Sequence, residues 1–557
     1  MHKKSFFKSL SILLVAAAFV FVGTGCKWFE LTPPDEYETN HPDVDVLTPP
    51  PGSILHTTDP NGNPITIISQ NGYSVSTSNA YATAAAADVL ESGGNAVDAA
   101  IAASYVLSVV EPYGSGIGGG GGMTIYDPET NEYKFLNYLA EAPASGSRYK
   151  NIGVPGFVSG MQTAYDMYGT KPFSELLKNA IYYADNGITV DDDLFFRIKN
   201  ARSSFSSQNT PFAYISKSGD LLAQSEFADI LRIIASEGSE SFYTGSIASM
   251  IVSATGMRAS DLASYETLVT DAVTGEFAGY TVASASAPFS GVTLIQMLKL
   301  CEILELPDPT ADPAGYLSTL CSITMACGSD RVKKICDTRF DTKTRDYQAM
   351  LTNEYVCNLM DLDYSDFEQD DEGQDTTHIS VVDKNGMAVA CTNTLTQFFG
   401  SKLYINGFFI NNALRNFGSL GLNTYAPGKR MRTYMCPTIF RNNETNEVFA
   451  VGTPGGTAIL SVMATVLTDN ILFGTPIQDA VNKRRIVIKG LHALYYEDGF
   501  EQFPRVVDHS AVSGYYAVPQ NVDAYFGSVN IAGYSPTSGY FATADLRRLG
   551  SGRATNY

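Results

Sequence analysis

Two runs of β-branched and apolar residues, separated by Asp383-Lys384-Asn385-Gly386, constrain the fold of this chain more than any other feature. They lie in TTHISVVDKNGMAVACTNTLT, residues 376–396. Because Asn-Gly accepts positive φ, the pattern predicts a β-hairpin. Further strands are predicted from Leu403 to Asn411 and from Thr438 to Val451, the latter with a break at Asn442-Asn443. The C-terminal third is therefore expected to be mostly sheet.

Helical patterns dominate the region before this hairpin. An Ala-rich stretch runs from Ala80 to Ser92 and ends at Gly93-Gly94, and Asn95 is placed to cap a second helix that continues to about Val110. Between roughly residues 150 and 345, helical segments such as Phe173 to Asn186 and Phe227 to Ser236 alternate with short loops. The chain thus combines helices and sheet, which places it in the α+β class.

A glycine-rich segment, EPYGSGIGGGGGM at residues 111–123, follows the second predicted helix. It lacks the Lys-Ser/Thr pair of a phosphate-binding loop. Glycine also allows two backbones to approach closely, and that is the interpretation we favour here. The segment is expected to pack tightly against neighbouring strands.

The size and charge of the chain limit its possible partners. It has 557 residues, 44% of them hydrophobic and 17% charged, which is enough to bury a large core. The formal net charge is −21. Nucleic acids and anionic membrane surfaces attract basic proteins, so neither is an expected partner.

The N-terminus has the pattern of an export signal. Lys3, Lys4 and Lys8 precede an apolar run from Leu10 to Val22, and small residues then lead to Cys26. This predicts a signal of the lipoprotein type over residues 1–26, although Gly23 stands where Leu is usual. Residues 27–53 are Pro-rich and are interpreted as a tether. We therefore expect an extracytoplasmic protein, either anchored to the membrane through a lipid on Cys26 or secreted.

The cysteines give no sign of a metal site. Seven follow Cys26, with no CxxC pair and no nearby His partner, so zinc is not expected. Export would permit one or two disulfides within the cluster of cysteines from Cys301 to Cys357, and free buried thiols are the open alternative. No metal and no organic cofactor is expected.

An acidic run ends directly at Thr376. Residues 361–375 include eight Asp or Glu and no apolar stripe, so they are expected to be exposed and mobile. Cleavage of the Asp375–Thr376 bond would give Thr376 a free α-amino group beside its own hydroxyl. An α-amine titrates at about 7.7 to 8.0, which suits a general base near neutral pH. One residue would then supply both nucleophile and base.

The order and spacing of ten short motifs resemble those of the γ-glutamyltranspeptidase family, from about Asn71 to the C-terminus. In chain order they are LESGGNAVDAAIAASYVLSVVEP, IGGGGGM, VPGFVSGM, YGTKPFSELL, TTHISVVDKNGMAV, FGS, INN, CPTIF, GTPGG and AD-x-RR. The resemblance implies a four-layer αββα sandwich of the N-terminal-nucleophile hydrolase type. It also implies a large subunit, residues 54–375, and a small subunit, residues 376–557, that interleave in one domain.

The resemblance assigns the catalytic roles. Thr376 is implied to be the nucleophile, and Thr394 to hydrogen-bond and position it. Gly455 and Gly456 match the oxyanion hole, where two backbone N–H groups meet the negative charge of the acyl-transfer intermediate. His378 is not a base in this family, so we expect it to be structural.

Several substrate-binding positions depart from the family pattern. Leu139 stands where γ-glutamyl enzymes carry an Arg for the α-carboxylate, and Ala413 and Asn416 replace a carboxamide and an Asp that hold the α-amino group. Thr433 and Tyr434 match a Ser pair at the carboxylate, and Thr396 replaces an Asn; with Asn416 they are the candidate substrate-binding residues. Candidates for receiving a carboxylate instead are Arg415, Arg430 and Arg432.

These observations predict an autoprocessed amidohydrolase or acyltransferase that cleaves a small-molecule or peptide-like amide through a threonyl acyl-enzyme. Loss of two charge contacts should weaken binding of a γ-glutamyl group, since each contributes about 1.5 to 3 kcal/mol. Two alternatives stay open. One is a true γ-glutamyl transferase or glutathione hydrolase with a rearranged clamp, and the other is a surface protein that has lost catalysis.

Overall fold

The computed structural model describes residues 72–205, 208–361, 375–489, 493–497, 516–520 and 526–556. All of them belong to one compact unit, Pro51–Tyr557. The predicted export signal, the tether and most of the acidic run lie outside the described residues. Among the described helices, none has both the length and the apolar character needed to cross a membrane.

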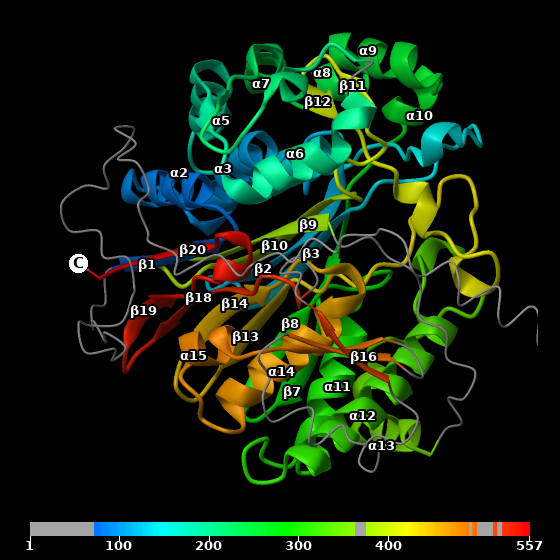
Figure 1. Cartoon of the computed structure of the whole chain (residues 1–557). Coiled ribbons are helices and arrows are strands. Elements are labelled where there is room, and N and C mark those ends of the chain that lie inside the picture. Colours follow the sequence, from blue (N-terminus) through cyan, green and yellow to red (C-terminus); the bar gives the residue numbers. More distant parts are fainter. Residues whose placement is uncertain are drawn as a thin grey trace, which may run out of the picture. The chain divides into compact units, whose positions relative to one another are not determined.

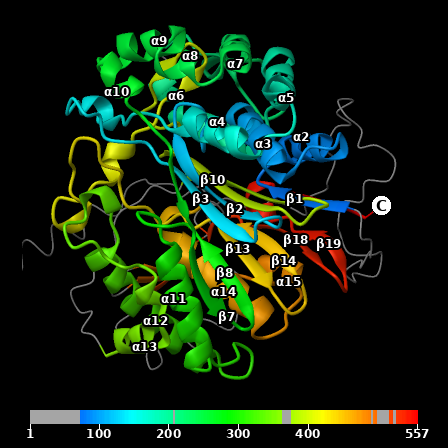
Figure 2. The same cartoon turned by 180° about the vertical axis from the view of Figure 1, so that it is seen from behind.

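Two antiparallel sheets are stacked face to face and covered by helices on both outer sides (Figures 1 and 2), which confirms the αββα sandwich. In spatial order the first sheet contains β20 (Ser551–Asn556), β1 (Gly72–Thr77), β9 (Asp375–Val382), β10 (Ala388–Thr396), β2 (Gly120–Asp127), β3 (Glu132–Tyr138) and β6 (Leu268–Asp271). The second contains β19 (Gly539–Ala542), β18 (Asn530–Ser535), β14 (Val448–Gly452), β13 (Thr438–Asn442), β8 (Tyr280–Ser284) and β7 (Val273–Phe277).

The helices form the two outer layers. The layer above the first sheet in Figure 1 contains α2 (Ala80–Glu91), α3 (Ala96–Val110), α4 (Phe157–Tyr168), α5 (Phe173–Asn186), α6 (Asp192–Phe205), α7 (Ser225–Glu237), α8 (Glu240–Tyr243), α9 (Ser246–Thr255) and α10 (Ala259–Ala263). On the second sheet lie α11 (Gly291–Ile303), α12 (Pro313–Lys334), α13 (Asn353–Leu359), α14 (Ile459–Ile471) and α15 (Ile477–Asn482). A separate hydrophobic core fills each helix–sheet interface, and a smaller one lies between the sheets.

Helix α3 is the central support of the first sheet. Its predicted cap, Asn95, accepts from the amide of Asp98, whose carboxylate in turn accepts from the amide of Asn95. All fifteen residues of α3 are buried, and Ala at five of these positions lets α2 and strands β9 and β10 approach closely. The α3 bounds and its cap agree with the sequence prediction.

The glycine-rich segment packs as predicted. It leads into β2, which lies between β10 and β3. A Cβ built on Gly121 would come within 2.3 Å of the Thr392 carbonyl oxygen, and one on Gly119 equally close to that of Thr394. Because these neighbours are backbone atoms, a side chain here would break the strand pairing. Glycine is therefore required by close approach of main chains next to the β9–β10 hairpin.

The hairpin itself forms as predicted, and its first strand holds a central place. β9 pairs with β10 on one side and with β1 on the other. Strands from before and after the Asp375–Thr376 bond are therefore interleaved in the first sheet, and the second sheet also combines strands from both parts of the chain. Neither the part before this bond nor the part after it contains all the strands of either sheet.

Two predictions about local structure were wrong. The single strand predicted from Leu403 to Asn411 is a small hairpin of β11 (Tyr404–Ile405) and β12 (Phe408–Phe409). Its turn is Asn406-Gly407, with φ of 41° and 115°, so an Asn-Gly turn signal was overlooked. Asp375, expected in the exposed acidic run, is 3% exposed as the first residue of β9.

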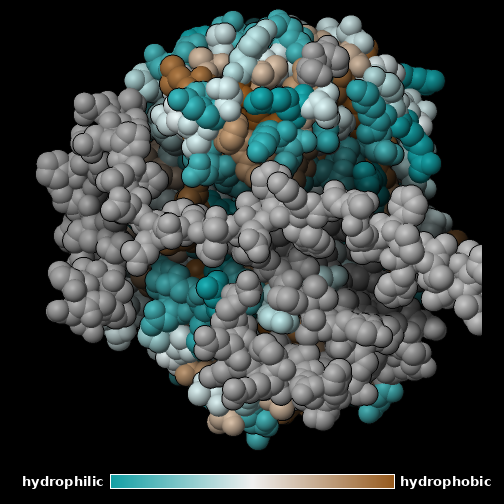
Figure 3. Space-filling model, viewed as in Figure 1, coloured by the Kyte–Doolittle hydropathy of each residue, from teal (hydrophilic) through white to brown (hydrophobic). Residues whose placement is uncertain are grey.

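The described surface is polar, and the described cysteines are free thiols. The outer helical layer near α5 to α10 is mainly hydrophilic, with isolated hydrophobic residues (Figure 3). Cys301, Cys321, Cys327, Cys336, Cys391 and Cys436 are buried, and Cys357 is exposed. Of the two alternatives for these cysteines, free thiols is therefore the one observed.

Candidate active site

Thr376 lies near the start of β9, opposite Thr394 of β10. It is 3% exposed, and its Oγ1 has no hydrogen-bond partner among the described residues. Its carbonyl oxygen accepts a hydrogen bond of 2.9 Å from Nη1 of Arg548. The strand pairing and this bond together fix the backbone at Thr376 and leave its hydroxyl available for chemistry.

Thr394 contacts the peptide bond that precedes Thr376. Its Oγ1 donates to the carbonyl oxygen of Asp375 at 2.5 Å and accepts from the amide of Thr396 at 2.8 Å. The resemblance implied a hydrogen bond to Thr376 itself. In the uncut chain the Asp375 carbonyl is still present, and it takes the Thr394 proton. A donor at this oxygen stabilises the negative charge that builds up when the carbonyl carbon is attacked.

The end of β10 is irregular at this point. The pairing of β9 with β10 shifts register between Thr394 and Thr396, and Thr396 has a φ of 85°. A positive φ at a β-branched residue is unfavourable, and such strain is commonly found at functional sites. Thr396, a candidate substrate-binding residue, is thereby brought into contact with Thr394.

The Pro454-Gly455-Gly456 turn follows strand β14 of the second sheet. Gly452, the last residue of β14, packs so closely on the ring of His378 that a Cβ there would lie 2.2 Å from Cε1. Gly455 and Gly456 have φ of 134° and 54°, which favour glycine. They lead through a 3₁₀ turn into α14, and the N-terminus of a helix presents N–H groups that favour negative charge.

His378 shares the sheet face of Thr376 but is fully engaged elsewhere. Its Nδ1 lies 2.8 Å from Thr392 Oγ1 and its Nε2 lies 3.0 Å from Ser380 Oγ. Burial lowers the pKa of this imidazole to about 3, so it is neutral at physiological pH. These contacts fit the structural role that was expected.

Two buried carboxylic acids, Asp375 and Glu111, share Arg548 as a charged neighbour. Burial raises the pKa of Asp375 to about 8, against the opposing effect of Arg548 and Arg197. Burial also raises the pKa of Glu111 to about 8, although Arg548 and Ser78 stabilise its charge. Asp375 Oδ1 and Glu111 Oε1 have no hydrogen-bond partner among the described residues. Burial near the uncut bond thus disfavours the charged forms of both acids.

The other predicted substrate-binding residues are held by the protein. Leu139 is fully buried in the core of the second sheet. Thr433 accepts from Ser290 through its carbonyl, and the ring of Tyr434 lies 3.5 Å below the guanidinium of Arg331. Asn416 is 8% exposed, and its carbonyl accepts from Asn423.

Of the three arginines considered for a substrate carboxylate, two serve the fold. Arg430 is fully buried and binds the Asn137 and Glu266 carbonyls and the Glu141 carboxylate. Arg432 donates to carbonyls at the C-terminal end of α12. Arg415 is exposed.

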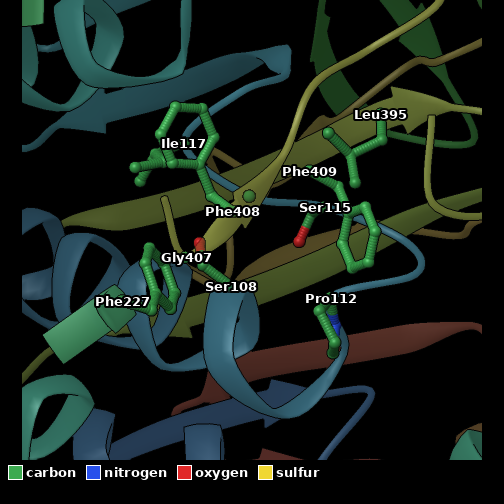
Figure 4. Close-up of a pocket in the computed structure, with 10 residues that line it drawn as sticks. Ser108, Pro112, Ser115, Ile117, Phe227, Leu395, Gly407, Phe408 and Phe409 are labelled. Atoms are coloured by element: carbon green, nitrogen blue, oxygen red, sulfur yellow. The ribbon is translucent and has the colours of Figure 1, made fainter. Parts of the chain in front are cut away.

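Sequence reasoning missed two residues that bind β9 at its start, one at Thr376 and one at Thr377. Arg548 was noted only as part of the AD-x-RR motif, and its contact with Thr376 joins segments 172 positions apart. Ser115, in the glycine-rich segment, accepts from the Thr377 hydroxyl at 2.9 Å. Ser115 also lines a cavity of about 10 Å³ with Ser108 and Leu395 (Figure 4). That volume holds about one water molecule, so it is not a substrate site.

Comparison with known proteins identifies the family. The model of the gamma-glutamyltranspeptidase family matches residues 82–555. The chain belongs to the gamma-glutamyltranspeptidase family. It is therefore an enzyme of the amidohydrolase and transpeptidase type, and the resemblance seen in the sequence is confirmed.

Known proteins differ in their similarity to this chain. The capsule biosynthesis protein CapD proenzyme of Bacillus anthracis is 39% identical over 424 residues, covering 75% of this chain and 79% of that protein. A glutathione hydrolase proenzyme of Bacillus subtilis (strain 168) is 29% identical over 485 residues, covering 76% and 82%. Cephalosporin acylase from Bacillus halodurans superposes with a TM-score of 0.76 at 22% identity, covering 90% and 98%, and shares the fold.

The raised pKa of Asp375 predicts a pH-dependent stability of the uncut chain. An acid whose pKa is higher when folded stabilises the folded state fully below its unfolded pKa, and this contribution is lost as the pH rises through the folded value. In a Thr376→Ala background, the melting temperature should therefore fall between about pH 5 and pH 9. Asp375→Asn should reduce that fall by roughly 2 °C or more, measured by scanning fluorimetry. Asp229→Asn, at an exposed carboxylate on α7, is the control that should leave the slope unchanged. Equal slopes in the Asp375→Asn and parent chains would refute this account of the site.

Proposed function

We propose that this chain is an extracytoplasmic, autoprocessed amidohydrolase or acyltransferase that works through a threonyl acyl-enzyme on Thr376. One observation carries the proposal. The Thr376 hydroxyl is buried without a hydrogen-bond partner among the described residues, and on the preceding peptide bond Thr394 donates a hydrogen bond to the carbonyl oxygen. Self-cleavage requires a hydroxyl that is not engaged in other hydrogen bonds, next to a carbonyl polarised by a hydrogen-bond donor.

The self-cleavage step follows from these atoms. Thr376 Oγ1 attacks the Asp375 carbonyl carbon, the C–N bond breaks, and the hydroxyl proton ends on the released amine. Water then hydrolyses the ester between Asp375 and Thr376. The products are a carboxylate at Asp375 and a free α-amine on Thr376. Several relatives are named as proenzymes, which supports processing of this kind.

The same groups then act on a substrate. The α-amine of Thr376 accepts the hydroxyl proton as Oγ1 attacks an amide carbonyl, and it returns the proton to the leaving amine. Backbone N–H groups of Gly455 and Gly456 bind the oxyanion. Water or an amine then accepts the acyl group from Thr376. The substrate is a small-molecule or peptide-like amide, and the name of the CapD relative makes a substrate of capsule biosynthesis one candidate.

The acyl specificity differs from that of γ-glutamyl enzymes. Leu139 is buried in the core, and Ala413 and Asn416 carry no charge, so an α-amino-acid head would lose water without gaining ion pairs. Acyl groups without that head avoid this cost.

Self-cleavage is tested on the purified protein. The wild-type chain should divide at Asp375–Thr376, and sequencing of the small fragment should begin Thr-Thr-His-Ile. Thr376→Ala should stay whole. Thr394→Ala should slow cleavage by about 10²- to 10³-fold through loss of one oxyanion donor, whereas Thr394→Ser should retain most of the rate. A folded wild-type chain that stays intact at 37 °C would support the catalytically inactive surface protein instead.

Donor preference is tested with acyl anilides. The processed enzyme should hydrolyse glutaryl anilide with a higher kcat/KM than γ-glutamyl anilide. Asn416→Asp should shift the ratio toward γ-glutamyl about 10-fold, because the donor's ammonium group gains a carboxylate partner. Asn416→Ala is the neutral control. A wild-type preference for γ-glutamyl anilide would favour the true γ-glutamyl transferase with a rearranged clamp.

The location of the enzyme is a proposal from the N-terminal sequence alone. With a lipid on Cys26, the protein should be found in the membrane fraction, and Cys26→Ser should move it to the soluble extracytoplasmic fraction. Mass spectrometry of the N-terminal peptide tests for the lipid directly. Wild-type protein recovered from the medium with an unmodified Cys26 would show that it is secreted without an anchor.

A further inference from the structure

We propose that Arg415 is a specificity residue that binds a free carboxylate at the end of the acyl group remote from the scissile amide. The inference rests on the proposed function and names its substrate class: acyl donors of the dicarboxylic half-amide type, such as a glutaryl group. Arg415 lies in a short 3₁₀ turn, η5 (Ala413–Asn416), immediately after Asn411-Asn412.

Hydrogen bonds connect η5 to the catalytic hairpin. Asn412 donates through its backbone amide to the carbonyl of Leu395, the residue between Thr394 and Thr396. The Asn412 side-chain amide donates to Gln397 Oε1 at 2.8 Å, and Nη1 of Arg415 donates to the same oxygen at 3.3 Å. Gln397 follows the irregular end of β10. Arg415 is thus held beside the strand end that carries Thr394, which in turn contacts the Asp375 carbonyl.

The guanidinium of Arg415 is available for a ligand. Its one hydrogen bond among the described residues is the long bond to Gln397, and no described carboxylate forms an ion pair with it. By contrast, Arg430 is saturated by two carbonyls and Glu141, and Arg432 by carbonyls of α12. A guanidinium has five N–H donors in a planar fork that fits a carboxylate. Arg415 is also exposed, so a substrate can reach it.

A second observation indicates a missing ligand at this position. Asn412 is 6% exposed, and its Oδ1 has no hydrogen-bond partner among the described residues, although its Nδ2 is fixed on Gln397. Buried acceptors in proteins are nearly always satisfied, so an unfilled one marks a place for a donor from a bound molecule. An amide N–H of the substrate is such a donor. Arg415 and Asn412, whose Oδ1 has no described partner, are therefore both hydrogen-bonded to Gln397 Oε1.

The charge of the surroundings favours an anion. The neighbouring Asn416 is neutral and no described carboxylate pairs with Arg415, so the positive charge of Arg415 is not neutralised locally. A charge-assisted pair with a substrate carboxylate is about twice as strong as a neutral hydrogen bond. Arg415 therefore selects for acyl donors that carry a free carboxylate and no ammonium group.

The test compares two donors of equal size, glutaryl anilide and 4-carbamoylbutanoyl anilide, which differ in one terminal carboxylate against a carboxamide. Arg415→Gln should lower the ratio of their kcat/KM values about 10- to 100-fold. Arg415→Lys should give an intermediate ratio, because an ammonium lacks the planar fork. Lys402→Gln removes another exposed cation and serves as the control for long-range charge, so its ratio should match the wild type.

Binding of glutarate to the purified protein, measured by calorimetry, separates this inference from the proposed function. Wild type should bind glutarate more tightly than pentanediamide, which has no carboxylate, and Arg415→Gln should abolish the difference. An unchanged donor ratio or an unchanged glutarate preference in Arg415→Gln would overturn the role of Arg415. Glutarate binding that depends on Arg415, in a protein that neither cuts itself nor hydrolyses any donor, would uphold the site and overturn the catalytic proposal.

Discussion

The proposed chemistry depends on the hydrogen bond from Thr394 to the Asp375 carbonyl. The position of that bond depends in turn on the packing of the whole sandwich. It exists because β9 and β10 pair in register up to Thr376 and Thr394. That register is held from behind by α3, whose small residues let the helix lie close to the sheet, and from the side by the glycine-rich β2. The pairing of β9 with β10 sets the distance between Thr376 and Thr394, and the packed layers keep that distance fixed.

The second sheet adds what the hairpin lacks. Gly452 packs on His378, so β14 brings the Pro454-Gly455-Gly456 turn toward the start of β9. Arg548, from the last part of the chain, holds the Thr376 carbonyl. The candidate site is thus assembled from three distant segments. Burial raises the pKa of Asp375 and Glu111 near the uncut bond, because their charged forms are poorly solvated.

Local signals predicted the local parts of this structure. The Asn95 cap, helix α5 and the β9–β10 hairpin were all legible in the sequence, since each depends on residues close together in the chain. The β11–β12 hairpin was missed because its Asn406-Gly407 turn lies inside an apolar run. The burial of Asp375 and the structural use of Arg430 and Arg432 could not be predicted, because their partners come from remote segments such as α12. The roles of Thr376 and Thr394 were suggested by the family motifs and not by composition or periodicity.

Because strands from the two parts of the chain are interleaved in the first sheet, folding has to precede cleavage. β9 pairs with β1 on one side, and β1 also pairs with β20, so main-chain bonds join the two parts across the first sheet on both edges of β1. A cut at Thr376 would remove one covalent link and none of these bonds, and the pieces would separate only by unfolding. Maturation is then a one-way step. A chain that unfolds after the cut would have to find its other half by diffusion, whereas the precursor folds with both halves tethered.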